Sequence, residues 1–352
     1  MAKKLFDFCV GNPPYNSEMG QGENRTYAPP VYHQFIDASF SVADNVELIH
    51  PARFLFNAGN TPKEWNEKML NNEHFRILRY EADANKVFPN TYINGGVCIS
   101  YQSTEKNYGK IGVFTPFQEL NTIIHKLQPF VNSSNLGDII HNQTRYNLDS
   151  MYKDYPEIKK SIGSNGRDRR IRNNAFEKIP LFHKDNSHNN DVPIFGVVKG
   201  KREWRYLNSK YIDDDHCNLH YWKTLISSAD GAAGTIGNPV PARVLGEPVV
   251  LPPNTGYTQT FIGVGSVETQ YEAIAIQKYL KTKLCRTAAG ILKITQHITP
   301  DIFRYVPIQD FSTSSDIDWS KSVHEIDLQL YRKYGLSNEE IDFIETYVKE
   351  MI

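Results

Sequence analysis

The first hundred residues carry short apolar runs with the spacings of strands and helices. Phe6, Phe8 and Val10 alternate with other residues, as they would along one face of a β-strand. Between residues 31 and 40, apolar side chains recur three to five positions apart, which favours an amphipathic helix. Each run is short and is bounded by polar or proline-containing segments. The pattern therefore predicts a strand that leads through a polar loop into a helix.

The same alternation of element types continues to about residue 101. The expected order is a strand over 46–56, a helix over 61–70, a strand over 75–80, and a loop with a strand over 86–101. Thr61 is placed as the N-cap of that helix and Pro62 at its first position. Strands and helices that alternate with short connections predict an α/β fold, with a first domain over residues 1–106.

The composition changes near residue 107, and the chain becomes rich in Asn, Ser, Lys and Arg between residues 131 and 190. Two short strands around a glycine turn are expected over 192–207, and a helix over 268–279. We expect an α+β domain over residues 107–312. Residues 313–352 are expected to form a helical hairpin, with Gly335 ending one helix and a capping box of Ser337 and Glu340 opening the next.

Charge and cysteine content narrow the class of protein. The 39 Lys and Arg residues balance 40 Asp and Glu residues, so a uniformly basic coat for nucleic acid is excluded and any DNA-binding face must be local. Cys9, Cys98, Cys217 and Cys285 show no Cys-x-x-Cys spacing, so no metal site is expected. The sequence shows no signal peptide and no long apolar stretch, which predicts a cytoplasmic protein without a membrane partner.

The strongest candidate for chemistry is the turn Asn12, Pro13, Pro14 and Tyr15, which follows the first apolar run and Gly11. The amide oxygen of Asn12 and a carbonyl of the proline turn can both accept hydrogen bonds from one amino group. The two prolines fix the backbone and remove two N–H donors, so the turn presents carbonyls. Tyr15 offers a face on which a flat base can stack. This combination favours binding of the exocyclic amino group of a base.

In motif and context, this turn resembles the Asn-Pro-Pro-Tyr motif of DNA adenine-N6 methyltransferases, in particular the Eco57I-like restriction-modification methylases. The resemblance is specific over residues 6–101 and looser from about 110 to 310. It implies a partial Rossmann-like methyltransferase domain followed by a target-recognition domain. It also implies S-adenosylmethionine as the cofactor and double-stranded DNA as the substrate.

The resemblance also implies roles for individual residues. Asn12, Pro13, Pro14 and Tyr15 would form the catalytic turn, and the adenine would leave the duplex to reach it. The segment around Phe88 is similar to a later aromatic motif of the family, in which a Phe closes over the extruded base. Tyr15 and Phe88 would then stack on the two faces of the adenine. The alternative for Phe88 is an ordinary core position.

The family's donor-binding half is not evident. Only residues 1–5 precede the first strand, whereas that half carries a Gly-rich loop and an acidic residue. Gly263 and Gly265 form a Gly-x-Gly after Phe261, but no Asp or Glu lies between Glu272 and Asp301 to hold a ribose. We interpret the Gly-x-Gly segment as a strand and turn of the DNA-binding part. A second subunit or an upstream segment is expected to carry the donor-binding motif.

Basic and polar residues of the second domain are candidates for DNA contact, because such side chains on flexible loops reach phosphates and guanine edges. One group lies in a Gly- and Asn-rich segment, and the other resembles a signature of the target-recognition region. The candidates are Arg167, Arg169, Arg170, Arg172, Lys283, Arg286, Lys293, Thr295 and Gln296. The alternatives are a solvated loop for the first group and helix core or surface for the second.

The sequence thus predicts a DNA adenine-N6 methyltransferase component of a restriction-modification system, with the donor held by a missing or separate half. Two alternatives stay open. One is a non-catalytic DNA sequence-recognition module or decoy. The other is a nuclease, for which only Glu81, Asp83 and Lys86 supply the acidic and lysine residue types that such a site uses. RNA or a protein glutamine could also accept a methyl group at such a turn.

Overall fold

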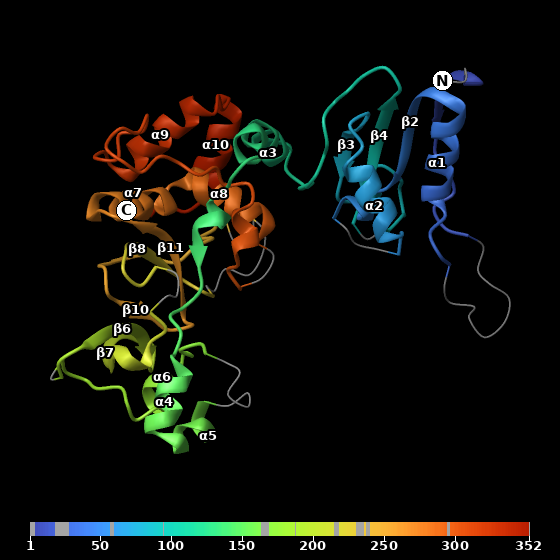
Figure 1. Ribbon diagram of the computed structural model, residues 1–352. Helices are drawn as coiled ribbons and strands as arrows, with labels where there is room; N and C mark the ends of the chain where they lie inside the picture. The colour runs from blue at the N-terminus through green and yellow to red at the C-terminus, as the bar shows by residue number, and fades with distance from the viewer. Residues whose placement is uncertain are drawn as a thin grey trace. The chain divides into compact units, whose positions relative to one another are not determined.

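The computed structural model describes residues 4–17, 28–56, 60–93, 95–162, 169–186, 188–214, 218–229, 236, 240–293 and 296–351. The chain forms two compact units, Met1–Asn121 and Thr122–Ile352 (Figure 1). The division lies after the boundary that we predicted at residue 106. The C-terminal helices, predicted as a separate part, lie within the second unit.

The first unit is built on a four-stranded sheet with the strand order β1-β2-β4-β3. β1 is parallel to β2, and the pairs β2–β4 and β4–β3 are antiparallel. The elements are β1 (Phe6–Gly11), α1 (Tyr32–Val42), β2 (Ala43–Pro51), η1 (Arg53–Phe56), α2 (Lys63–Leu70), β3 (Phe75–Glu81), η2 (Ala84–Lys86) and β4 (Val97–Ser103). This order confirms the predicted mixture of helices and strands.

Two local predictions differ from the structure. The strand expected over 46–56 ends at Pro51, and Arg53–Phe56 form a 3₁₀ helix that buries Phe54 and Leu55. Thr61 does not cap α2. Its hydroxyl donates instead to the side-chain oxygen of Asn66, 2.8 Å away, and α2 begins at Lys63 after Pro62. Burial of the side chain decided both cases against the local sequence signal.

The core of the first unit lies where α1 and α2 meet the sheet. Tyr32 and Ile36, one turn apart on α1, are buried together with Phe54, Met69 and Phe75. The helix predicted after position 31 is confirmed, but of its predicted apolar positions only Ile36 is buried, and Phe35 is 44% exposed.

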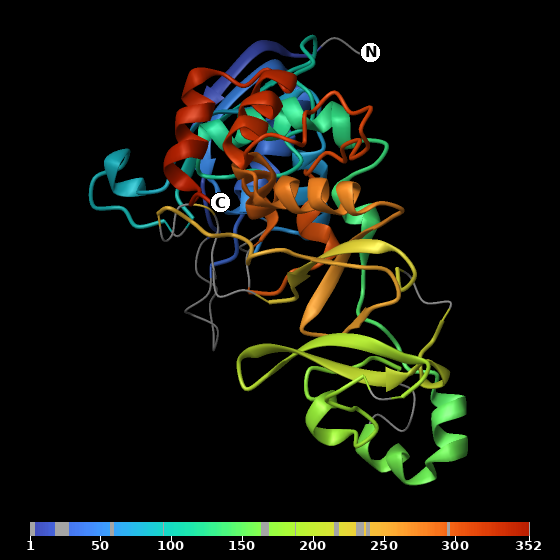
Figure 2. The ribbon, with the colours of Figure 1, turned by 90° about the vertical axis from the view of Figure 1, so that its left-hand side faces the viewer.

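The second unit is layered (Figures 1 and 2). One sheet has the order β5-β11-β8-β9 and the other has the order β10-β6-β7. α7 packs against β8, β9 and β11, with α8 and α9 next to it. The strands are β5 (Ile140–His141), β6 (Asp191–Val198), β7 (Lys201–Asn208), β8 (Trp222–Ser227), β9 (Val249–Leu251), β10 (Gly256–Tyr257) and β11 (Phe261–Val267).

The helices of this part of the chain are mostly short. The α-helices are α3 (Gln118–Val131), α4 (Leu148–Asp154), α5 (Lys159–Ile162), α6 (Ala175–Lys178), α7 (Gln270–Lys281), α8 (Lys283–Leu292), α9 (Val323–Lys333) and α10 (Asn338–Tyr347). The 3₁₀ helices are η3 (Leu136–Ile139), η4 (Pro156–Ile158), η6 (Ser209–Tyr211) and η7 (Pro300–Phe303). Within the described segments, no helix is long and apolar enough to cross a bilayer.

Turn chemistry predicted from sequence is confirmed at three places in this unit. β6 and β7 form the expected hairpin, whose turn residues Lys199 and Gly200 both have positive φ. Gly335 follows α9 with φ +61°. Ser337 and Glu340 form the capping box of α10, with the Ser337 amide 2.7 Å from the Glu340 carboxylate.

Candidate active site

The candidate catalytic turn lies at the carboxyl end of β1, beside the neighbouring parallel strand β2. Gly11, the last residue of β1, pairs with Leu48. The turn is fixed at its far end, because the Val31 amide donates to the Tyr15 carbonyl at 3.0 Å and the Ser17 amide to the Pro29 carbonyl at 2.9 Å. Asn12 is exposed at this edge, where ligands of open α/β sheets commonly bind.

Tyr15 is half-buried, in contrast to Asn12. Its hydroxyl has no hydrogen-bond partner in the described part of the chain. Burial raises the pKa of this phenol, and nearby Cys98 adds to the effect. The Asn12 side chain lies close enough to lower the pKa in part, although the contact lacks the geometry of a full hydrogen bond. The structure therefore brings Asn12 and Tyr15 together, with an uncharged Tyr15 at neutral pH.

A cluster of aromatic side chains that we had not predicted lies in the core next to this turn. Tyr32 stacks on His50 with ring centroids 5.7 Å apart, and its ring also meets Trp65 edge-on at 6.3 Å. Cys98 links this cluster to the turn, since its Sγ lies 3.7 Å from His50 Nδ1 and it affects the pKa of both Tyr15 and Tyr32. These residues come from α1, β2, α2 and β4, so no local motif could reveal them.

Full burial lowers the pKa of His50 to about 4 and keeps the ring neutral. Its Nε2 lies 2.7 Å from the Ser100 hydroxyl. Two further polar atoms of the cluster, His33 Nδ1 and Trp65 Nε1, are buried without a hydrogen-bond partner among the described residues. Unpaired buried polar atoms are rare in folded proteins. Together with the Tyr15 hydroxyl, these two atoms make three such atoms in or beside this cluster.

Phe88, the predicted clamp, follows η2 and is half-buried. Its backbone amide donates to the Ala84 carbonyl at 2.8 Å, which folds this segment into a turn. Among the described rings, none of the contacts joins Phe88 to Tyr15, so the clamp stays a prediction. The same loop carries Tyr92, which is 91% exposed and which the sequence analysis did not select.

The predicted strand β1 forms, and its apolar side chains are exposed. Phe6, Phe8 and Val10 are 58%, 69% and 75% exposed, although the strand itself forms as expected. Among the described residues, β1 is the edge of its sheet and pairs only with β2. Parallel strands are normally covered on both faces. A parallel edge strand with exposed aromatic residues is therefore an unusual surface feature.

The predicted DNA-contact residues around position 170 and at Thr295 and Gln296 differ in exposure, and some lie outside the described residues. Arg167 and Thr295 lie outside the described residues. Arg169 is exposed and lies 3.9 Å from the Asp213 carboxylate, and Gln296 is exposed. Arg170 is exposed at a cavity, and Arg172 is half-buried. DNA contact by these exposed or half-buried residues stays a prediction.

In the segment that resembles the target-recognition signature, three predicted DNA contacts instead bond or pack within the fold. Arg286 is fully buried, and its guanidinium donates to the backbone carbonyls of Lys281, Thr282, Arg243 and Lys349. Lys293 is buried as well. Lys283 bonds to the carboxylate and carbonyl of Glu345. Burial therefore argues against DNA contact by Arg286 and Lys293. Contact by Lys283, which is half-buried, stays a prediction.

The Gly-x-Gly segment lies inside β11, which pairs with β5 on one side and β8 on the other. A side chain at Gly263 would collide with the Tyr257 hydroxyl and the Asn218 amide. Its glycine therefore serves close packing, and the interpretation of this segment as a strand is confirmed. The described residues do not form a cradle for a nucleoside here.

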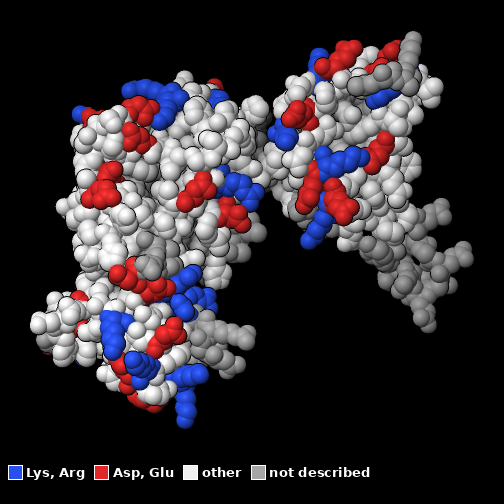
Figure 3. Space-filling model, in the orientation of Figure 1, with Lys and Arg blue, Asp and Glu red and all other residues white. Residues whose placement is uncertain are grey.

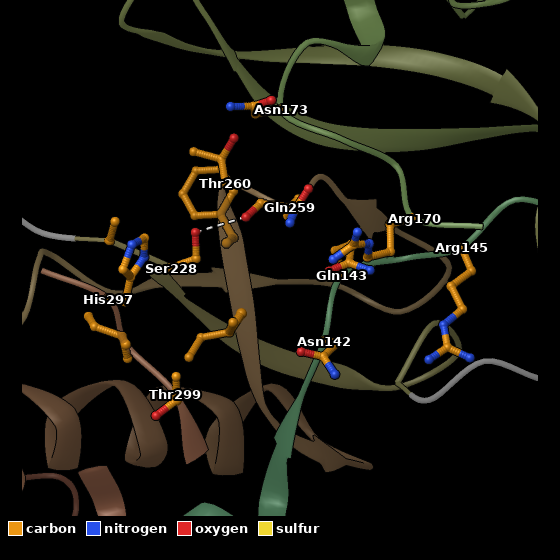
Figure 4. Close-up of a pocket in the computed structure, with 14 residues that line it drawn as sticks. Asn142, Gln143, Arg145, Arg170, Asn173, Ser228, Gln259, Thr260, His297 and Thr299 are labelled. Atoms are coloured by element: carbon orange, nitrogen blue, oxygen red, sulfur yellow. Dashed lines mark hydrogen bonds between the residues drawn. The ribbon is translucent and has the colours of Figure 1, made fainter. Parts of the chain in front are cut away.

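Charge on the surface is mixed rather than segregated. On the face shown in Figure 3, Lys and Arg lie interspersed with Asp and Glu on both units. A cavity of about 610 Å³ in the second unit differs, because Arg145, Arg170 and His297 line it together with several amides (Figure 4). Of these three residues, only Arg170 was among the DNA contacts predicted from the sequence.

Comparison with known proteins supports the resemblance over the first part of the chain. Residues 1–88 match the family described as Eco57I restriction-modification methylase. A Mycoplasma pneumoniae protein described as an uncharacterized adenine-specific methylase is 28% identical over 116 residues, 32% of this chain. The match spans only 27% of that relative's length.

A solved structure, described as the type IIL restriction-modification enzyme MmeI in complex with DNA, aligns with 97% of this chain and 56% of its own. Its sequence identity is 11% and its TM-score 0.34, too low to establish a shared fold. The family resemblance inferred from sequence is confirmed where the match lies. Residues 1–88, which include the turn at the end of β1, are the part of this chain that matches the Eco57I restriction-modification methylases.

Proposed function

We propose that this chain is a component of a DNA adenine-N6 methyltransferase and provides the acceptor side of the reaction. One observation carries the proposal. The turn of residues 12–15 stands at the carboxyl end of a parallel strand, with exposed Asn12 beside half-buried Tyr15, inside the segment that matches the methylase family. The name of the adenine-specific relative supports adenine as the base.

The turn would bind the amino group of an adenine that has left the duplex. The Asn12 amide oxygen and the Pro13 carbonyl would each accept one of its hydrogens. Two such bonds localise the lone pair of N6 and make it a better nucleophile. Tyr15 would stack on the base, and Phe88 would close on its other face, which replaces the stacking lost on leaving the helix. A general base at the nitrogen is not required if the proton leaves after transfer.

S-adenosylmethionine is the donor that the family resemblance implies, but the described residues do not fit it. The glycines of β11 are used in packing, and the first unit offers no Gly-rich loop followed by an acidic strand end in its described part. We therefore propose that a second subunit or an upstream segment binds the donor. The free edge of β1 and its exposed Phe6 and Phe8 are the surface against which that unit would pair.

Substitution of Asn12 tests the proposal. The chain would be expressed with its neighbouring genes in a host that lacks adenine-N6 methylation, and modified adenines would be mapped by sequencing. Asn12→Ala should lower methylation by at least about 100-fold, as loss of one positioned hydrogen bond does in other active sites. DNA affinity should stay within about twofold, because Asn12 contributes little surface to the duplex.

Asn60→Ala is the matched control, since Asn60 is an exposed asparagine of the same unit and is not part of the turn. Wild-type methylation by Asn12→Ala would show that the site assignment is wrong. A loss of methylation in both variants would point to a general effect on folding.

A second candidate function is sequence recognition without catalysis, as a specificity module or a decoy. It is favoured by the lack of a donor cradle in the described residues. It predicts that the chain binds DNA but that no partner confers methylation on it. The same host experiment with the wild-type chain distinguishes the two functions, because only the first leaves modified adenines.

A further inference from the structure

The cavity of the second unit combines basic and amide side chains that come from four separate segments. Its walls include Arg145 after β5, Arg170 in the segment before α6, Gln259 before β11, and His297 (Figure 4). Its volume of about 610 Å³ lies in the range of pockets that take small ligands or single groups of larger ones. Among the described residues that line it, none carries a carboxylate. In a chain with balanced total charge, this composition favours an anionic ligand.

The backbone holds the two arginines opposite each other. Arg145 and Arg170 form an isolated antiparallel bridge. Hydrogen bonds on either side fix this pairing: the Tyr146 amide donates to the Arg169 carbonyl at 2.6 Å and the Ile171 amide to the Thr144 carbonyl at 3.1 Å. Residues directly opposite in an antiparallel pair present their side chains on the same face, so both guanidinium groups are placed where one acceptor-rich ligand can meet them.

Hydrogen bonds also hold the other segments that line the cavity. The Gln259 amide donates to the Ile171 carbonyl at 2.7 Å, and the Ser228 hydroxyl to the Gln259 carbonyl at 2.8 Å. The Ile298 amide donates to the Ser228 carbonyl at 2.9 Å, which fixes the segment next to His297. These bonds use backbone groups and the serine hydroxyl, and they leave the Gln259 side chain at the cavity. A binding surface built on a fixed backbone loses little conformational entropy on binding.

These residue types match the edges of DNA bases. Arginine binds the O6 and N7 acceptors of guanine in a bidentate way, and the amides of Asn and Gln pair with N6 and N7 of adenine. Asn142, which is exposed, and Gln259, which is half-buried, provide such amides at this cavity. Phosphate oxygens are the other acceptors on DNA that the arginines could contact.

We propose that this cavity is where the second unit contacts target DNA, with Arg145 and Arg170 as the paired donors. The proposal rests on the proposed function, because it takes duplex DNA as the ligand. It assigns DNA recognition to Arg145 and Arg170, of which only Arg170 was predicted from the sequence. It also replaces the buried Arg286 and Lys293 as contacts of this unit.

The test uses the full chain and a pool of duplexes with a randomised central segment. Bound duplexes would be sequenced to give the base preference, and affinities would be measured by fluorescence anisotropy at several salt concentrations. The variants are Arg145→Gln and Arg170→Gln. Arg332→Gln is the matched control, because Arg332 is exposed in the last turn of α9 and does not line the cavity. Thermal unfolding of each variant checks that it is folded.

If an arginine reads a base, its Gln variant should lose preference at one position by about 5- to 150-fold. If it contacts a phosphate, affinity should fall equally for all sequences, and the salt dependence should become shallower by about one ion. Arg→Lys variants separate these cases further, since lysine keeps the charge but not the bidentate geometry. Either result supports DNA contact at the cavity.

Unchanged affinity and preference in both Gln variants, with DNA binding by the wild-type chain, would overturn this inference alone. The proposed function would stand in that case, since it depends on the turn at Asn12. A wild-type chain that binds no duplex at any salt concentration would instead count against both proposals.

Discussion

At the scale of single residues, burial determines what each side chain can do. Asn12 is exposed and can reach a ligand, whereas Tyr15 is half-buried beside Cys98 and contributes mainly its ring. Arg286 was predicted to contact DNA but is fully buried. It looks like a DNA contact in the sequence, yet its guanidinium satisfies four backbone carbonyls in the core. Removing such a group would leave those carbonyls unpaired, so its role is structural.

His50 allows a prediction about pH. Its pKa is lowered from 6.5 to about 4 by burial, so the folded state binds fewer protons than the unfolded state between these values. The stabilisation is complete above about pH 6.5 and is lost as the pH falls toward 4. We expect the free energy of unfolding to drop by as much as about 3 kcal/mol over this window from His50 alone.

The measurement is urea denaturation at several pH values for the wild type and for His50→Phe, which keeps an aromatic ring against Tyr32. The variant should have a flatter pH profile, whatever its absolute stability. His324→Gln, at an exposed position of α9, should keep the wild-type profile. An identical slope for His50→Phe and the wild type would show that His50 is not the titrating group.

At the scale of elements, β1 and β3 are the two edges of the same sheet, and they differ in what they expose. β1 presents Phe6, Phe8 and Val10 beside the candidate catalytic turn, whereas Leu78 of β3 is 42% exposed next to a register shift. Irregular pairing commonly protects an edge from addition of another strand. β1 lacks such protection in its paired register with β2, which makes it the better edge for a partner.

We expect Phe8→Lys to abolish methylation in the host that carries the neighbouring genes. A charge in the middle of the β1 face would oppose its burial by the donor-binding unit. The thermal stability of the purified chain should change little, by about 0.5 kcal/mol or less, because Phe8 is 69% exposed.

Leu78→Lys makes the same type of change on the opposite edge strand and should leave methylation intact. Normal methylation by Phe8→Lys would mean that β1 is not the docking edge. The assignment of Asn12 would be unaffected by that result.

At the scale of the whole molecule, the two units divide the proposed work. In the proposals above, the turn in Met1–Asn121 would bind the adenine, and the basic cavity in Thr122–Ile352 would contact DNA. Neither unit offers a donor cradle in its described residues. The chain also spans only about a quarter of the length of its methylase relative, so the complete activity is proposed for an assembly.

Calorimetric titration of the purified chain with S-adenosylmethionine tests this division. We expect no binding stronger than a dissociation constant of about 1 mM, since no described residue set matches the donor. A calorimetric titration with duplex DNA under the same conditions is the positive control and should show a heat of binding. A gel mobility-shift assay with the same duplex should show the complex independently. Micromolar binding of the donor by the chain alone would contradict the division and would favour a self-sufficient enzyme.

The sequence by itself determined the features that depend on local chemistry. The strand over residues 6–11, the β6–β7 hairpin with its glycine turn and the capping box at Ser337 all follow from short-range rules. The turn of residues 12–15 belongs to this class as well, because proline and asparagine define it over four positions. The family match over residues 1–88 agrees with that local signal.

Only the tertiary structure decided which side chains face solvent and which segments meet. It exposed Phe8, buried Arg286, and placed Arg145 opposite Arg170 across 25 positions of sequence. It also gathered Tyr32, His50 and Trp65 from three elements into one cluster. The physical reason is that burial and pairing depend on long-range packing, which the spacing of residues within one element does not specify.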